Sequence, residues 1–257
     1  MGKIIAFANQ KGGVGKTTSA VSVAACLGAR GKKVLMVDID PQGNASSGFG
    51  VNKKATKLST YDLLVSDEVT TAQVIQKTPF QNVDILPASI QLAGAEIELV
   101  EIENRTYRLK QALLEVKNNY NYIIIDCPPS LGLITLNALA ASNTILIPIQ
   151  CEYYALEGLS QLMATLRQVK RLYNPDIDIE GVLLTMYDGR LNLTMQVVDE
   201  VKKYFPKKVF KTVIPRNVKL SEAPSYGQPV YYYDRYSKGS ISYSELANEI
   251  IRNNQEV

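Results

Sequence analysis

Short apolar runs alternate with amphipathic stretches along almost the whole chain, and this alternation leaves few possible architectures. The runs are rich in valine and isoleucine and nearly continuous, which is typical of parallel strands buried on both faces. They lie at residues 4–8, 34–37, 83–86, 122–125, 145–149, 182–184 and 209–214. The stretches between and after them predict helices at residues 16–29, 92–118, 131–141, 156–173, 193–204 and 243–252.

Strands that alternate with helices in this way predict βαβ units. We therefore expect an α/β fold with a mostly parallel, twisted sheet of about seven to eight strands and helices on both faces. No repeat, low-complexity tract or linker rich in glycine, proline or serine interrupts the chain. Residues 1–257 are accordingly expected to form a single domain.

Composition excludes several classes of protein. Three cysteines without paired spacing, and no secretory start, favour a reducing, cytoplasmic setting. No apolar stretch reaches the roughly 18 residues that a membrane span needs, so no membrane partner is expected. The chain has no histidine, which removes the usual general base and the usual zinc ligand. A net charge of +3 does not by itself indicate nucleic acid.

Residues 10–18, Q-K-G-G-V-G-K-T-T, follow the first expected strand and open the first expected helix. A phosphate loop needs this context, because its glycines turn backbone N–H groups toward phosphates at a helix N-terminus. Lys16 should reach the β- and γ-phosphates, and the Thr17 hydroxyl should bind Mg²⁺. A glycine-rich turn that binds nothing is disfavoured, since strand, loop and helix occur together. The expected nucleotide contacts are Lys11, Gly12, Gly13, Val14, Gly15, Lys16, Thr17 and Thr18.

The loop departs from the usual pattern in one informative way. Gln10 stands where the first glycine is usual, and a second lysine, Lys11, follows it, which is the deviant Walker A pattern. Lys11 lies too early in the loop to serve the same phosphate as Lys16. It could contact a nucleotide held by a facing subunit and act in trans, as an arginine finger does. The alternative is a solvated lysine on a surface loop.

Three aspartates follow expected strands. Asp38 and Asp40 lie at the carboxyl end of the second strand, where ligands of open α/β sheets bind. Asp126 ends a wholly apolar strand, the Walker B arrangement, and should hold Mg²⁺ through water, as Asp38 could also do. Without a histidine, Asp40 is the best candidate to orient the attacking water. Each acid could instead serve only as a helix cap or turn residue.

Positive charge is concentrated in one stretch. Residues 202–219 contain seven lysines and arginines and no acid. Several phosphate contacts are enough for nonspecific DNA binding, and a dimer doubles their number. Composition alone favours the alternative of a solvated face.

Residues 11–18, 37–44, 123–130, 150–158 and 214–224 together resemble the ParA/Soj chromosome-partitioning ATPases of the MinD/ParA superfamily. The similarity runs along the whole chain. It implies a Mg²⁺-dependent ATPase switch for chromosome or plasmid segregation in the cytoplasm, on the nucleoid. An ATP-bound homodimer would bind double-stranded DNA nonspecifically and leave it when a ParB-type centromere-binding protein stimulates hydrolysis.

The resemblance also implies residue roles. Lys11 would be the trans-acting lysine and Asp40 the catalytic acid, with Lys16 on the phosphates. The other implied positions fall into three sets: Glu152 and Glu157 at the dimer interface, Thr185, Met186, Pro215, Arg216 and Asn217 around the adenine, and Arg190, Arg216 and Lys219 on DNA.

Three competing interpretations remain open at this point. A MinD-like ATPase would need a basic amphipathic C-terminal helix, whereas residues 245–257 carry three glutamates and one arginine. A nitrogenase-type electron carrier would share an iron–sulfur cluster through Cys127 and Cys151, although small core thiols are the simpler interpretation. A scaffold could bind ATP without turnover, which Asp40 argues against.

Overall fold

The computed structural model describes residues 2–152 and 155–255, with the backbone alone for residues 155–158. Within these residues, seven strands form one sheet in the order β3-β4-β2-β5-β1-β6-β7. The strands are β1 (Lys3–Phe7), β2 (Val34–Asp38), β3 (Gln76–Lys77), β4 (Val83–Leu86), β5 (Tyr122–Asp126), β6 (Thr144–Gln150) and β7 (Asp178–Thr185). The edge strand β3 pairs antiparallel with β4, and the remaining described pairs are parallel. The expected α/β fold is confirmed.

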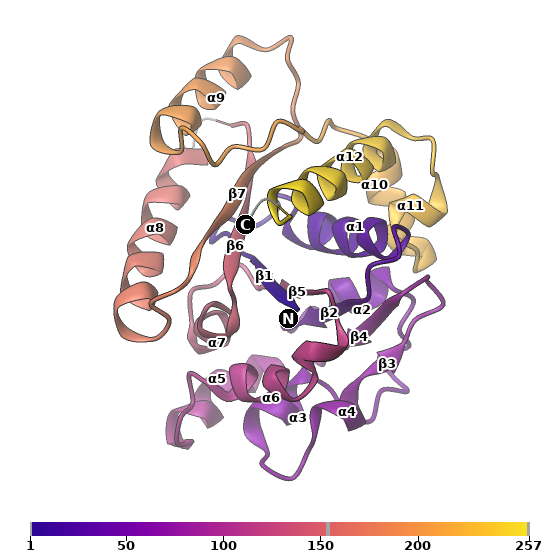
Figure 1. Cartoon of the computed structure of the whole chain (residues 1–257), viewed down its shortest axis with the longest axis vertical. Helices are drawn as coiled ribbons and strands as arrows, with labels where there is room; N and C mark the ends of the chain where they lie inside the picture. The colour runs from indigo at the N-terminus through magenta and orange to yellow at the C-terminus, as the bar shows by residue number, and fades with distance from the viewer. Residues whose placement is uncertain (1, 153–154, 256–257) are drawn as a thin grey trace.

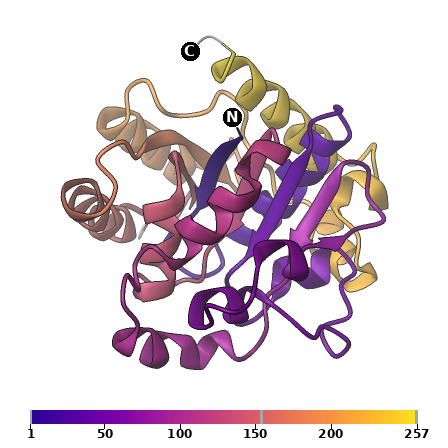
Figure 2. The same cartoon turned by 60° about the horizontal axis from the view of Figure 1, so that its bottom comes forward.

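Helices cover both faces of this sheet, as Figures 1 and 2 show. Successive strand residues alternate between two buried cores: Ile4 and Ala6 face one, and Ile5 and Phe7 face the other. The first core is covered by α3 (Thr60–Val65), α4 (Thr71–Val74), α5 (Leu92–Glu98), α6 (Arg108–Val116), α7 (Leu133–Ala141), α8 (Ala155–Leu172) and α9 (Asn192–Tyr204). The second is covered by α1 (Lys16–Gly28), α2 (Asn44–Gly48), α11 (Val230–Tyr233) and α12 (Lys238–Asn253).

Most expected helices lie within two residues of the observed ones. The last helix begins five residues earlier than expected, at Lys238, because the Ser237 hydroxyl accepts a hydrogen bond from the Ser240 N–H and caps it. The sequence analysis missed the short elements α2, α3, α4, α11, α10 (Val218–Glu222) and β3.

The expected helix at residues 92–118 is wrong as one element. It is divided into α5, a 3-10 turn at Leu99–Glu101, and α6. Between them Asn104 adopts a left-handed backbone with φ 55°, and the Tyr107 N–H donates to its carbonyl oxygen over 2.7 Å. A left-handed residue ends a right-handed helix, and asparagine is among the residues that adopt this conformation most readily.

The expected strand at residues 209–214 is also wrong. This segment runs beside β7 and makes one isolated bridge, between Val182 and Val209, and a second bridge joins Tyr187 to Pro215 just after it. The backbone N–H groups of Lys211 and Thr212 donate to the Glu249 carboxylate of α12, at 2.8 and 3.0 Å, so they are not free to continue a ladder. The sheet therefore ends at β7 among the described residues.

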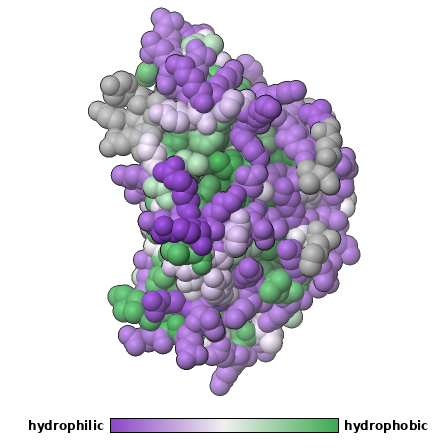
Figure 3. All heavy atoms as spheres, turned by 60° about the vertical axis from the view of Figure 1, so that its left-hand side comes forward, coloured by the Kyte–Doolittle hydropathy of each residue, from purple (hydrophilic) through white to green (hydrophobic). Residues whose placement is uncertain are grey.

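The face that carries α8 and α9 shows apolar side chains in a hollow surrounded by hydrophilic residues (Figure 3). A cavity of about 280 Å³ lies there between Met163 and Arg167 of α8 and Tyr204 and Phe205 at the end of α9. No helix within the described ranges is both long enough and apolar enough to cross a membrane.

Candidate active site

The sheet order brings three polar segments to one edge. Strand β5 lies between β1 and β2, and Asp126 pairs in register with Phe7 on one side and Asp38 on the other. The loop after β1 and both aspartates therefore meet at the carboxyl ends of the central strands. Ligands of open α/β sheets bind at this edge.

The loop after β1 has the backbone of a phosphate cradle. Gly13 and Gly15 adopt positive φ angles of 74° and 85°, which residues with a Cβ rarely adopt. Gly15 directly precedes α1, so the loop ends on the helix N-terminus. One side chain that the sequence analysis did not single out holds this loop: Asn9 accepts from the Lys11 N–H at 3.0 Å and donates to the Pro148 carbonyl at 2.7 Å. Asn9 could have been found as the first polar residue after β1.

Lys16 is 7% exposed, and its Nζ donates to the Lys11 carbonyl over 3.0 Å, so the ammonium group lies across its own loop. Burial lowers the pKa of Lys16, and the negative charge of Asp126 opposes that shift. An ammonium group without an anionic partner in hydrogen-bond contact, placed at a helix N-terminus, is suited to phosphate oxygens.

Asp126 is fully buried, and neither of its carboxylate oxygens has a hydrogen-bond partner in the described part of the chain. Asp38 is equally buried, but its oxygens accept from the Ser46 N–H and hydroxyl, both at 2.7 Å, and from the Asp40 N–H at 3.2 Å. Burial raises the pKa of both carboxyl groups. An unpaired buried carboxylate is costly unless a cation or water meets it.

The donor set fits Mg²⁺ bound together with phosphates. No cluster of three or more His, Cys, Asp or Glu side chains able to hold a metal by itself occurs in the described ranges. Mg²⁺ commonly keeps several waters and uses one or two carboxylates plus substrate phosphates. Asp126 and the Thr17 hydroxyl fit this pattern. The oxygens of Asp38 are already hydrogen-bonded to Ser46 and Asp40, so a contact from Asp38 to Mg²⁺ would run through water.

Asp40 combines two features. Its Oδ1 accepts from the Gln42 N–H at 2.9 Å and closes a turn, so Asp40 does have the turn role that the sequence analysis gave as the alternative to catalysis. No described donor is bonded to its second oxygen, and the residue is 7% exposed. Asp40 can therefore shape the turn and still present one carboxylate oxygen to a water molecule.

A cavity of about 420 Å³ lies beside the loop and collects all five residues expected around the adenine. It is lined by Thr185, Met186, Pro215, Arg216 and Asn217 together with Gly15 and Thr18. The Thr185 hydroxyl donates to the Val14 carbonyl at 2.8 Å and so ties the end of β7 to the loop. Met186, which follows β7, has φ 50°, a strained backbone of the kind found at functional sites.

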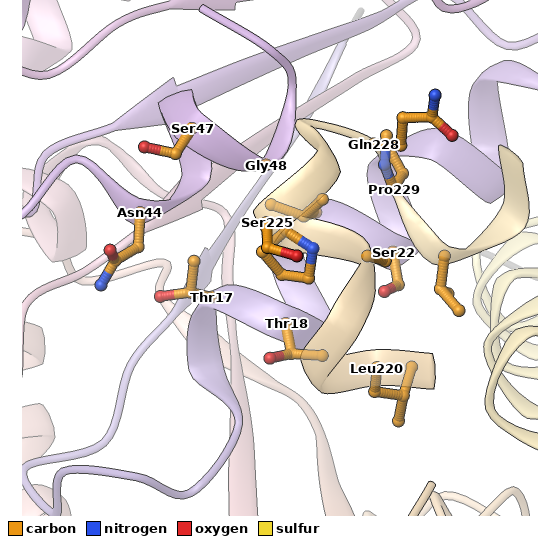
Figure 4. Close-up of a pocket in the computed structure, with 14 residues that line it drawn as sticks. Thr17, Thr18, Ser22, Asn44, Ser47, Gly48, Leu220, Ser225, Gln228 and Pro229 are labelled. Atoms are coloured by element: carbon orange, nitrogen blue, oxygen red, sulfur yellow. The ribbon is translucent and has the colours of Figure 1, made fainter. Parts of the chain in front are cut away.

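A second cavity, of about 410 Å³, is also lined by Thr18. Figure 4 shows Thr17 and Thr18 at the start of α1, facing Asn44 and Ser47 of α2 and Ser225 of the 3-10 turn Ala223–Tyr226. Thr18, Leu220 and Pro224 line both cavities, so the two form neighbouring parts of one cleft.

Comparisons with known proteins agree with this geometry. A family model described as an AAA domain matches residues 2–179. The chain is 61% identical to the sporulation initiation inhibitor protein Soj of Bacillus subtilis, covering 98% of this chain and 100% of that protein. It is 51% identical to the chromosome partitioning protein ParA of Myxococcus xanthus, over 98% and 89% of the two chains. The chain belongs to the ParA/Soj family of chromosome-partitioning ATPases.

A solved structure supports the same conclusion for the fold. The cobyrinic acid a,c-diamide synthase of Mycobacterium smegmatis, with bound ADP and magnesium, superposes with a TM-score of 0.87 and 36% identity. The match covers 99% of this chain and 96% of that one. The family and the ATPase activity expected from the sequence are thus confirmed.

In this ParA/Soj ATPase the backbone of Lys11 contacts Lys16, but the Lys11 side chain is directed to Glu152. Its Nζ is 3.4 Å from the Glu152 carboxylate, and Arg216 reaches the other oxygen of Glu152 at 3.6 Å. Half-exposed Glu152 thus links the phosphate loop to the segment beside the adenine cavity. The side chain of Glu157, the other residue expected at the dimer interface, lies outside the described part.

The cations expected on DNA all have acidic neighbours. Arg190 is paired with Asp188, Lys219 with Glu222, and Arg216 with Glu152, at 2.6, 2.9 and 3.6 Å. The stretch 202–219 contains no acid, but acids from other segments reach it. Three of its lysines, Lys202, Lys207 and Lys211, are exposed and have no ion-pair partner among the described residues. Exposed pairs are weak and screened, so phosphates can replace these acids.

The cysteines do not fit an iron–sulfur site. Cys127 is fully buried and Cys151 is 7% exposed. Burial raises the pKa of both thiols, that of Cys151 to about 11, whereas cluster ligation needs thiolates. Both behave as small core residues.

Proposed function

We propose that this ATPase is a Mg²⁺-dependent switch, in which an ATP-bound homodimer binds double-stranded DNA nonspecifically and hydrolysis releases it. The observation that carries the proposal is that the two lysine side chains of one loop point in different directions. Lys16 lies across its own loop, whereas Lys11 is directed to the half-exposed Glu152 on the surface. A lysine in that position is available to a nucleotide on a second protomer.

Residues of the cleft supply the hydrolytic steps. Lys16 and the loop N–H groups would hold the phosphates, and Thr17 and Asp126 would hold Mg²⁺, which stabilises the charge that develops on them. Asp40 would orient the attacking water with its free carboxylate oxygen, and Lys11 of the facing protomer would complete the site. Because both cores share one sheet, we propose that residues 1–257 act as a single ATPase domain.

The proposed partner is a ParB-type centromere-binding protein, which would act in the cytoplasm on the nucleoid. The test is ATP hydrolysis measured with the protein alone, with nonspecific DNA, and with DNA plus a candidate partner. Turnover should rise only modestly with DNA and strongly when both are present. Equal rates in all three mixtures would rule the switch out.

Arg190→Glu combined with Lys219→Glu should abolish ATP-dependent DNA binding. Each change replaces a cation with an acid and leaves Asp188 or Glu222 in place, so both sites become negative. Dimerisation should persist, because neither side chain contacts the phosphate loop in the hydrogen bonds described. Wild-type binding should weaken steeply with salt as counterions are released. The measurement is filter binding or anisotropy with duplexes of unrelated sequence.

Lys54→Glu combined with Lys57→Glu is the matched control for that experiment. It makes the same change in net charge at exposed lysines of another surface loop. DNA binding that falls equally in both double variants would reflect overall charge and not a defined surface. Strong sequence preference in the wild type would equally contradict the proposal.

A MinD-like membrane attachment is less well supported by this chain. Helix α12 packs against α1 through buried Tyr243, Leu246 and Ile250. Its apolar face is therefore covered by protein and is not available to a lipid surface.

A further inference from the structure

We propose that the amino edge of the sheet carries a second anion site, which takes the phosphate group of a small phosphorylated ligand. An open cavity of about 520 Å³ lies there, within the size range of small-molecule sites. It is lined by Gly2, Lys3, Lys32, Lys117, Asn121, Tyr122, Asn143 and Asn254. At this edge Lys3, the first residue of β1, donates a hydrogen bond to Asn254, directly after α12.

The cavity collects residues that precede neighbouring strands. Lys3 opens β1, Lys32 comes shortly before β2, Asn121 directly precedes β5, and Asn143 directly precedes β6. Because these strands are adjacent and parallel, their first residues meet at one edge. Lys117 follows α6, and Gly2 allows close approach there, since a Cβ on it would lie 2.5 Å from the Lys117 carbonyl oxygen.

Two asparagines present donors to this space. Asn121 Oδ1 accepts from the Lys33 N–H and Asn143 Oδ1 accepts from the Ile4 N–H, both at 2.8 Å. Each amide oxygen is therefore occupied, whereas no described acceptor takes a hydrogen bond from either Nδ2. The NH₂ groups remain as donors at a cavity that both residues line.

The charges point to an anion. Lys3 is balanced by Glu180, 2.6 Å away, and also donates to Asn254. Lys32 and Lys117 have no ion-pair partner in the described ranges, and no described residue lining the cavity is acidic. The Glu180 carboxylate, which also accepts from Asn254, is neutralised by Lys3. The two unpaired ammonium groups of Lys32 and Lys117 and the two amide donors match the oxygens of a phosphate.

This site is separate from the nucleotide cleft. The cleft lies beyond the carboxyl ends of the same strands, and none of its lining residues lines the amino-edge cavity. A strand of five residues spans roughly 16 Å, so a phosphate bound at one edge does not touch a ligand at the other. Filling the cleft with ADP therefore leaves the proposed site free for a test.

A purely structural role is the competing explanation. Lys32 and Lys117 follow the C-termini of α1 and α6, where cations stabilise the helix dipole. That role predicts a lower melting temperature when the lysines are neutralised, but no binding of phosphate and no effect on the amides of Asn121 and Asn143.

The test is a titration of ¹⁵N-labelled protein with inorganic phosphate at constant ionic strength, with ADP and Mg²⁺ held at one equivalent per protein so that no free ADP competes for the proposed site. The side-chain NH₂ signals of Asn121 and Asn143 should shift saturably in the wild type. Lys32→Gln combined with Lys117→Gln should weaken phosphate binding by at least about tenfold, because two charge-assisted hydrogen bonds are lost. Lys54→Gln combined with Lys57→Gln, with the same loss of charge, should bind phosphate as the wild type does.

Several results would overturn the proposal. Amide signals that do not saturate, or an equal loss of affinity in the control variant, would show general charge screening. A melting temperature that falls in Lys32→Gln/Lys117→Gln with unchanged phosphate shifts would leave only the helix-dipole role. A short duplex that displaces phosphate from these amides at equal phosphate concentration would assign the edge to DNA.

Discussion

Asp40→Ala should bind ATP and dimerise but hydrolyse ATP about 10²- to 10⁴-fold more slowly than the wild type, the range for loss of a positioned acid–base group. Asp40 has one carboxylate oxygen without a described donor, and it lies next to Asp38 at the phosphate edge of the sheet. Without this group the attacking water loses its orientation, whereas the phosphate and Mg²⁺ contacts remain. The variant should therefore stay on DNA.

The turn that Asp40 closes makes a second variant necessary. Alanine removes the acceptor for the Gln42 N–H, a bond worth about 0.5–1.5 kcal/mol, and could shift the loop. Asparagine keeps an amide oxygen in that place and has no carboxylate. If the role is chemical, Asp40→Asn should lose turnover as alanine does.

Two assays distinguish the outcomes. Phosphate release with DNA present gives the turnover, and a fluorescent ATP analogue gives nucleotide affinity. If Asp40→Asn hydrolyses ATP normally and only Asp40→Ala fails, the turn is what matters and another group must orient the water. If both variants turn over normally, Asp40 has no part in the mechanism.

The parts of the site that the sequence predicts are those whose neighbours lie close along the chain. The phosphate loop follows β1, and Asp38 and Asp126 are the last residues of the buried strands β2 and β5, so the parallel sheet has to bring them to one edge. Ser46, which holds Asp38 with two hydrogen bonds, was missed because it lies eight residues further along the chain, in the short helix α2 that the sequence analysis did not predict.

The parts that the sequence does not predict depend on distant partners. The segment 209–214 has the composition of a strand, but two of its backbone N–H groups donate hydrogen bonds to the Glu249 carboxylate of α12. The stretch 202–219 contains only basic charged residues, yet Arg216 within it pairs with Glu152, which follows the end of β6. Neither contact leaves a signal in local periodicity or charge count. The break at Asn104 is local, but helical periodicity alone does not reveal it.

Lys16→Ala should lower ATP affinity by about 10²-fold or more. The Lys16 ammonium group lies at the N-terminus of α1 without an anionic hydrogen-bond partner, and it is the charge expected on the β- and γ-phosphates. Charge-assisted hydrogen bonds contribute about 1.5–3 kcal/mol each, so losing two has an effect of this size. Calorimetry with ATP and Mg²⁺ measures it, and a melting curve without nucleotide shows whether the variant is folded.

Lys11→Ala should behave in the opposite way, with ATP affinity close to that of the wild type and no ATP-dependent dimer in sedimentation or light scattering. The Lys11 ammonium group pairs with the partly exposed Glu152, and exposed pairs contribute only about 0–1 kcal/mol, so the monomer loses little. Glu152→Gln removes that pair and leaves Lys11 charged, and it should bind ATP as Lys11→Ala does. If monomeric Lys11→Ala lost ATP affinity as severely as Lys16→Ala, both lysines would serve the same nucleotide. The facing protomer would then gain nothing from Lys11, and the case for a site completed in trans would fail with it.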